Sequence, residues 1–237
     1  RCSICLNAQQ FGNFEVSNFN LALGSGSVSF NYYDANWNGL SLKYLGKPME
    51  GFPKYEKGKF YDLQANLFAR LDNLGTLSQK FTFSGRNTCR LSATMTPSET
   101  AKYNEISYAF SFPISESKLK LDSIAINPEE SLKIQKVFSA KRVEVECAYG
   151  NVVFEGDLNL LVQDNRIFGG TTYSLRFMPR KEGNTLTWNL KISFERPDGS
   201  PIYMNKESAK SLDIPNLPRG TLKLGGVKFA FSNPVSY

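Results

Sequence analysis

The 237-residue chain contains no histidine. Histidine is the most frequent general base near neutral pH and a common zinc ligand, so its absence excludes histidine-based triads and histidine-containing metal sites. The chain also lacks a Walker A loop, a dinucleotide-binding glycine pattern and a nucleophile elbow. We therefore expect a chain that is not an enzyme on its own and that uses no cofactor or metal.

Long apolar runs and glycosylation sequons are missing as well. No stretch approaches the roughly 18 to 20 apolar residues of a membrane helix, so we expect no membrane insertion. No Asn-x-Ser/Thr sequon is present, which disfavours a secreted eukaryotic glycoprotein and favours a bacterial origin.

Cysteine is scarce, with four residues in the chain. Cys2 and Cys5 form a C-x-x-C pair without the second pair or histidines that a zinc site needs, and without the following helix of a redox motif. Cys89 and Cys147 alternate in phase with apolar residues, which predicts that each packs as a small hydrophobic side chain. A bridge between them requires neighbouring or facing strands, and the pattern leaves that open.

Positive charge is in moderate excess, with a net charge of +6 and a pI of about 9.0. This charge suits nucleic acid, an anionic glycan or an anionic surface. The lysines and arginines are spread along the chain, and the densest run, at residues 179–181, lies in a turn. Scattered charge is typical of solvated surface, so we expect no nucleic-acid partner.

Alternation with period two dominates the chain. In Thr185–Glu195 the apolar residues, Trp188 among them, occupy one face and polar residues the other, as in a half-buried strand. Apolar periodicity of the helical kind is confined to Pro97–Tyr103 and Asn205–Leu212, each able to form one or two turns. About sixteen short strands with turns every 8 to 12 residues predict an all-β fold, a large antiparallel two-sheet β-sandwich of the jelly-roll or extended type with little helix.

The expected strands fill most of the chain, and we predict a single domain over residues 1–237. Besides 185–195, they are 14–23, 27–33, 40–45, 63–71, 77–83, 89–95, 106–114, 119–126, 132–138, 142–149, 152–154, 158–162, 171–177, 221–224 and 227–231.

The two tryptophans differ in context. Trp188 lies on the apolar face of its strand and is expected in the core. Trp37 lies in a polar, turn-rich loop with Tyr33, Asp34 and Asn36. Aromatic rings stack on the C–H faces of sugars and carboxylates or amides bond to hydroxyls, so these four residues form the best candidate ligand site. The alternative is that Trp37 packs down onto the core as an anchor for its loop.

Other candidate sites are weaker. The aromatic and basic segment Gly51–Tyr61 resembles single-stranded nucleic-acid grooves in composition, and Tyr203 near Asp198 is a further exposed-aromatic candidate. A glycosidase with two carboxylates is a third possibility. Its candidate acids all lie in expected turns, where aspartate is common without function: Asp34, Asp157, Asp164 and Asp198.

Three segments together resemble the accessory, carbohydrate-binding-module-like β-sandwich domains of bacterial glycoside hydrolases. They are Ile106–Pro113, Leu119–Asp122 and Gly183–Leu190: an aromatic strand ending in proline, a turn with a short apolar strand, and a Gly-x-Thr-Leu strand. The resemblance implies a non-catalytic module of a larger secreted or cell-surface bacterial protein, which binds a polysaccharide or oligosaccharide. It equally allows a structural domain that packs on an adjacent catalytic domain.

Overall fold

The computed structural model describes residues 9–11, 13–16, 19–23, 26–39, 63–84, 87–115, 117–127, 135–147, 150–195, 221–224 and 227–230. Within these ranges the chain is all-β, with two short 3₁₀ turns and no α-helix, so the predicted fold class with little helix is confirmed. The described residues contain no helix that is long and apolar enough to cross a membrane.

The strands are long and antiparallel. Their bounds are β1 (Gln9–Phe11), β2 (Phe14–Val16), β3 (Asn20–Leu23), β4 (Gly26–Asp34), β5 (Leu63–Leu71), β6 (Gly75–Ser84), β7 (Thr88–Pro97), β8 (Tyr103–Pro113), β9 (Lys118–Leu121), β10 (Ile124–Ile126), β11 (Gln135–Cys147), β12 (Gly150–Asp164), β13 (Thr172–Phe177), β14 (Arg180–Glu182), β15 (Thr185–Glu195), β16 (Thr221–Leu224) and β17 (Val227–Ala230), with 3₁₀ turns η1 (Asp72–Leu74) and η2 (Asn165–Phe168).

The chain divides into two compact units, Arg1–Ile202 and Tyr203–Tyr237. The second unit contains the hairpin β16–β17. The first contains the other strands and both 3₁₀ turns of the described residues. The expectation of one domain over residues 1–237 stays a prediction.

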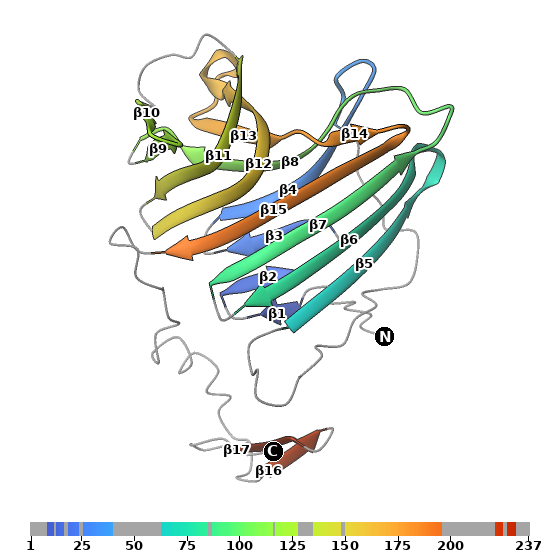
Figure 1. The fold of residues 1–237 in the computed structure, drawn as a ribbon, viewed down its shortest axis with the longest axis vertical. Helices are drawn as coiled ribbons and strands as arrows, with labels where there is room; N and C mark the ends of the chain where they lie inside the picture. Colours follow the sequence, from blue (N-terminus) through green and yellow to red (C-terminus); the bar gives the residue numbers. More distant parts are fainter. Residues whose placement is uncertain are drawn as a thin grey trace. The chain divides into compact units, whose positions relative to one another are not determined.

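Fifteen strands of the first unit form one hydrogen-bonded sheet. Its main path runs β1-β2-β3-β4-β8-β13-β12-β15-β7-β6-β5, with β11, β9, β10 and β14 attached at its side. Figure 1 shows β15, β7, β6 and β5 side by side, with β11 and β12 curving away from them.

The sheet bends within the hairpin β11–β12. The first half of β12, residues 151–155, pairs with β15, and its last five residues, 160–164, pair with β13. Gly156 lies between the halves at a φ of 147°. A Cβ there would lie 2.8 Å from the carbonyl oxygen of Asn189, so only glycine allows β12 to turn so close to β15. Strands that leave one layer for another at such bends make the corners of packed sheets.

The bend brings the two halves of the sheet face to face. Phe30 on β4 and Trp188 on β15 are separated by three strands along the sheet, which would be about 19 Å in a flat sheet. Their ring centroids are 6.1 Å apart, and those of Phe14 on β2 and Phe83 on β6 are 5.7 Å apart. The predicted sandwich is therefore one sheet folded into two layers, with the alternating apolar side chains between them.

Several detailed expectations are confirmed. Trp188 is 4% exposed, and its indole N–H donates to the carbonyl of Phe177. Cys89 and Cys147 are both buried, as expected for small hydrophobic side chains. Burial raises the pKa of the Cys89 thiol, which suits a structural rather than a reactive cysteine.

One helical expectation is wrong within the described residues. Pro97–Tyr103 forms the turn between β7 and β8. The N–H of Ser98 donates to the carbonyl of Leu74 at 3.0 Å instead of starting a helix, because this turn packs on η1. Four segments lie outside the described residues: the Cys2–Cys5 pair, the expected strand 40–45, the segment 51–61, and the stretch 196–212 with Asp198, Tyr203 and the second possible helix.

Candidate functional site

The loop after β4 presents Trp37 to solvent. Trp37 is 56% exposed, so the alternative in which it anchors the loop in the core is wrong. Its backbone has a φ of 62°, in the left-handed region. That region is uncommon for non-glycine residues and unusual for a bulky side chain. The chain closes behind it through a bridge between Tyr33 and Gly39.

Asp34 holds this loop in shape. One carboxylate oxygen accepts the backbone N–H groups of Asn36 at 2.8 Å and Asn38 at 2.9 Å, and the other accepts the Asn38 amide at 3.3 Å. The backbone N–H of Trp37 donates to the Asp34 carbonyl at 3.0 Å. The hydrogen bond from the Asn38 N–H holds the pKa of the Asp34 carboxyl below its ordinary value. Asp34 therefore organises the loop with both oxygens already engaged.

A second contact fixes the loop from outside. The side-chain amide of Asn104, at the start of β8, donates to the carbonyl of Ala35 at 2.9 Å. Asn36 is exposed, and its side chain remains at the surface of the loop beside Trp37. The tip is thus tied at both ends, which reduces the conformational entropy that a ligand would have to remove.

Tyr33 forms the base of the site. Its ring centroid lies 6.3 Å from that of Trp37, with an interplanar angle of 49°. The Tyr33 ring also contacts the guanidinium of Arg176, which lies 5.1 Å from the ring centroid. Arg176 is bonded at 3.1 Å to Glu105, which also accepts the hydroxyl of Ser107. These two ionised side chains are 10% and 3% exposed, so a buried ion pair holds the Tyr33 ring in place.

The structure thus brings the four predicted residues together at the end of β4 and in the loop that follows it, with distinct roles. Tyr33 and Trp37 provide two rings at an angle, Asn36 provides an exposed amide, and Asp34 maintains the backbone. Tilted rings with an exposed face suit contacts with the C–H groups of a sugar or another flat, partly apolar ligand. The two supporting residues, Arg176 and Asn104, are distant in sequence and gave no local signal.

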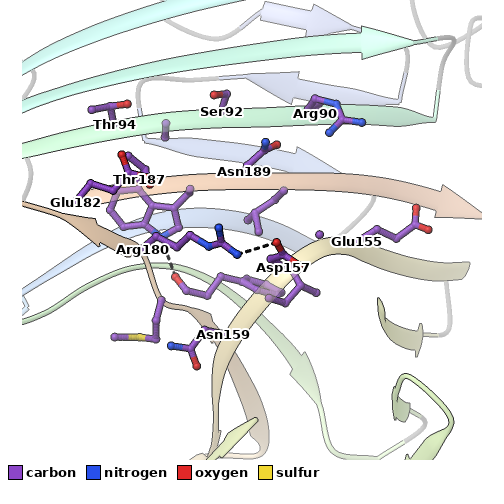
Figure 2. Close-up of a pocket in the computed structure, with 17 residues that line it drawn as sticks. Arg90, Ser92, Thr94, Glu155, Asp157, Asn159, Arg180, Glu182, Thr187 and Asn189 are labelled. Atoms are coloured by element: carbon purple, nitrogen blue, oxygen red, sulfur yellow. Dashed lines mark hydrogen bonds and ion pairs between the residues drawn. The ribbon is translucent and has the colours of Figure 1, made fainter. Parts of the chain in front are cut away.

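A second concave region lies at the corner of the sheet and was not predicted. Figure 2 shows it between β7, β15, the bend of β12 and β14, where it encloses about 390 Å³. Its lining is mostly polar and includes Arg90, Ser92, Asn189, Asp157 and Arg180. The alternating pattern of the sequence indicated which side chains of each strand point outward. It did not indicate the register between strands, which determines which of these side chains meet in the groove.

Two of the three carboxylates that line this corner groove, Asp157 and Glu155, are paired with cations. Asp157 accepts from Arg180 at 2.7 Å and also from Lys141. Glu155 contacts Lys191 at 2.8 Å, and the hydrogen bond from Lys191 is the main cause of its lowered pKa. Acid catalysis needs a carboxyl whose pKa is raised, so these environments favour electrostatic and binding roles.

The remaining candidate acid in the described part of the chain is structural. Asp164 is 1% exposed and accepts from the backbone N–H and the guanidinium of Arg166. It caps η2. Among the described residues, no three histidine, cysteine, aspartate or glutamate side chains lie together in a way that could hold a metal ion.

Comparison with known proteins adds no assignment, because no protein-family model matches the chain and no curated protein matches it significantly.

Proposed function

We propose that this chain is a non-catalytic, carbohydrate-associated module that binds a glycan through Trp37 and Tyr33. The observation behind the proposal is the exposed indole of Trp37 on a backbone held at a φ of 62° by hydrogen bonds to Asp34. A strained and fully supported backbone that presents a large apolar ring to water is typical of a ligand site.

The geometry suits sugar recognition in three ways. The Trp37 ring offers an apolar face for the C–H groups of a pyranose, and Tyr33 lies at an angle that forms a second wall. The exposed Asn36 amide can donate to and accept from hydroxyls. Because the loop is already rigid, binding costs little ordering entropy.

The role of Asp34 in this proposal differs from the sequence-based hypothesis that it orients sugar hydroxyls. Its oxygens accept three hydrogen bonds from within the loop. We therefore assign hydroxyl recognition to Asn36 and loop geometry to Asp34.

A non-catalytic role is favoured over a carboxylate-pair glycosidase. Inverting and retaining glycosidases both need one protonated carboxyl near neutral pH, beside a second carboxylate. In the corner groove, Lys191 lowers the pKa of Glu155, and two cations neutralise Asp157. A general acid would need the opposite environment.

The test is affinity electrophoresis against soluble hydroxyethyl cellulose, xylan, galactomannan and laminarin. We expect at least one of them to retard the protein, and Trp37→Ala to weaken that binding by about tenfold or more, as for a buried aromatic at the centre of an interface. Phe168→Ala is the matched control, because Phe168 is 69% exposed on a different turn. Equal retardation of Trp37→Ala and the wild type, or no retardation by any of them, would contradict the proposal.

The alternative is an interaction domain that packs on an adjacent catalytic domain. Ile167 and Phe168 favour it, since both are exposed on the rigid turn η2. Either role is compatible with a module of a larger secreted or cell-surface bacterial protein.

A further inference from the structure

The outer surface of β6, β7 and β15 concentrates positive charge among hydroxyl and amide groups. We call it the outer polar face. It consists of the outward side chains of three neighbouring strands: Ser78, Lys80 and Thr82 on β6, Arg90, Ser92 and Thr94 on β7, and Thr187, Asn189 and Lys191 on β15.

The strand register places like charges together on this face. Arg90 lies directly opposite Lys191 on β15, and on the other side Lys80 lies opposite Ser92, one diagonal step from Arg90. Directly opposed like charges destabilise a sheet, and diagonal neighbours are within reach of long side chains. The unliganded protein is therefore less stable with these three cations on adjacent strands than it would be with neutral side chains at the same positions.

The cations of the outer polar face are only partly neutralised. Lys191 contacts Glu155 at 2.8 Å. No carboxylate within the described ranges forms an ion pair or a hydrogen bond with Arg90 or Lys80, and both side chains are exposed. Two cations thus remain available to an external anion, next to a third.

The corner groove continues this face at one side. Figure 2 shows Arg90, Ser92 and Thr94 in a row along β7, with Thr187 and Asn189 on β15 beside them. Beyond β15 the groove is bounded by the ion pair between Arg180 and Asp157. A ligand that follows the row would meet hydroxyls, an amide and a cation within one bounded channel.

We infer that the outer polar face and the corner groove bind an acidic polysaccharide containing uronic acids. The planar fork of the Arg90 guanidinium matches a carboxylate in a bidentate geometry, and Lys80 supplies a second cation. The serine, threonine and asparagine side chains match the hydroxyls of the same sugar units. The inference rests on the proposed function for the ligand being a glycan, but it concerns residues separate from the Trp37 loop.

Two other polyanions fit less well. The outward positions of β6, β7 and β15 contain no aromatic ring on which nucleic-acid bases could stack. Glu155, Asp157 and Glu182 line the same groove, so the local potential is moderate. That potential favours one carboxylate per sugar over the dense charge of a sulfated chain.

The experiment measures affinity for polygalacturonate, with dextran sulfate, neutral dextran and single-stranded oligo-dT as comparison probes. We expect the wild type to bind polygalacturonate most tightly. The double variant Arg90→Gln/Lys80→Gln should bind it about tenfold or more weakly, with a shallower salt dependence because two contacts between a cation and a carboxylate of the polyanion are lost. Lys118→Gln on β9 is the control for one removed charge, since Lys118 is 79% exposed and forms a surface ion pair with Glu146.

The outcomes separate this inference from the proposed function. Loss of polygalacturonate binding in the double variant, with Lys118→Gln unchanged, supports the inference whether or not Trp37→Ala affects any neutral glycan. Equal binding by all variants, tighter binding of oligo-dT or dextran sulfate, or no binding of polygalacturonate overturns it. Retardation by a neutral glycan that depends on Trp37 would then leave the proposed function intact.

Discussion

Two turns of this protein are built around an aspartate and expose an aromatic ring, but they differ in which residue takes the left-handed backbone conformation. In the first, Asp34 accepts backbone N–H groups and Trp37 takes the left-handed conformation. In the second, Asp164 accepts the N–H of Arg166, Phe168 is exposed, and Gly169 takes the left-handed conformation at a φ of 78°.

The difference bears on our proposal that Trp37 is the residue that binds the ligand. Glycine adopts positive φ at little cost, and η2 uses it where the chain must reverse. The Trp37 loop places its largest side chain at that kind of position, although glycine would be less strained there. A strained residue persists when its surroundings hold it and its side chain is useful, so the comparison favours our proposal that Trp37, rather than Phe168, binds the ligand.

The largest expected effect concerns the arginines that support the two turns. Arg176 forms a buried pair with Glu105, and Arg176→Leu leaves that carboxylate buried without its cation. We expect a loss of about 3 kcal/mol in the free energy of unfolding, measured by urea denaturation. Arg166→Leu should cost less. Asp164 is also buried, but it keeps its hydrogen bond from the backbone N–H of residue 166, and the exposed position of Arg166 lets water reach the carboxylate. Equal losses would mean that the two turns are supported alike.

An intermediate effect on stability is expected from substituting Gly169 and Trp37, the residues with a left-handed backbone in the two turns. Apart from its two chain neighbours, no atom of the described residues lies within 4 Å of a Cβ added to Gly169, so Gly169→Ala tests backbone strain and should destabilise by about 1 kcal/mol. Trp37→Gly should leave the free energy of unfolding unchanged or slightly higher. Thermal and urea unfolding measure both. A loss in Trp37→Gly as large as that in Gly169→Ala would show that the Trp37 backbone is not strained.

The smallest effect is a pH dependence confined to the Trp37 loop. The folded pKa of Asp34 lies below its ordinary value of 3.8, so its contribution to loop stability is fully present above that pH and is lost as the pH falls through the lower, folded pKa. Acrylamide quenching of Trp37 in a Trp188→Phe background should stay constant above about pH 4 and change at lower pH. Asp34→Asn should abolish that change, and a transition that persists in the variant would assign it to another group.

The alternating pattern predicted the fold class because each strand buries one face. Thr185–Glu195 shows this, with Trp188 in the core as expected. The bend at Gly156 was not predicted, because it depends on the approach of β12 to Asn189, a contact between segments distant in sequence. For the same reason 152–154 and 158–162, expected as two strands, are halves of β12.

For the site as well, features carried by neighbouring residues could be predicted from the sequence, and contacts between distant segments could not. The cluster Tyr33, Asp34, Asn36 and Trp37 was recognisable because its members lie within five consecutive residues. The position of Trp37 outside the core, and the use of Asp34 within the loop, depended on hydrogen bonds that composition does not specify. The charge cluster of Lys80, Arg90 and Lys191 required the register of three strands and could not be predicted from charges spread along the chain.

The most direct test of the account uses ¹⁹F NMR of the protein labelled with 5-fluorotryptophan. The chain has two tryptophans, so the spectrum contains one resonance from exposed Trp37 and one from buried Trp188, assigned with a Trp37→Phe variant. On saturation with the glycan that retards the protein, we predict that the Trp37 resonance shifts and loses its solvent isotope effect while the Trp188 resonance stays in place. An unchanged Trp37 resonance in the fully bound protein would contradict the assignment of the binding site to this loop.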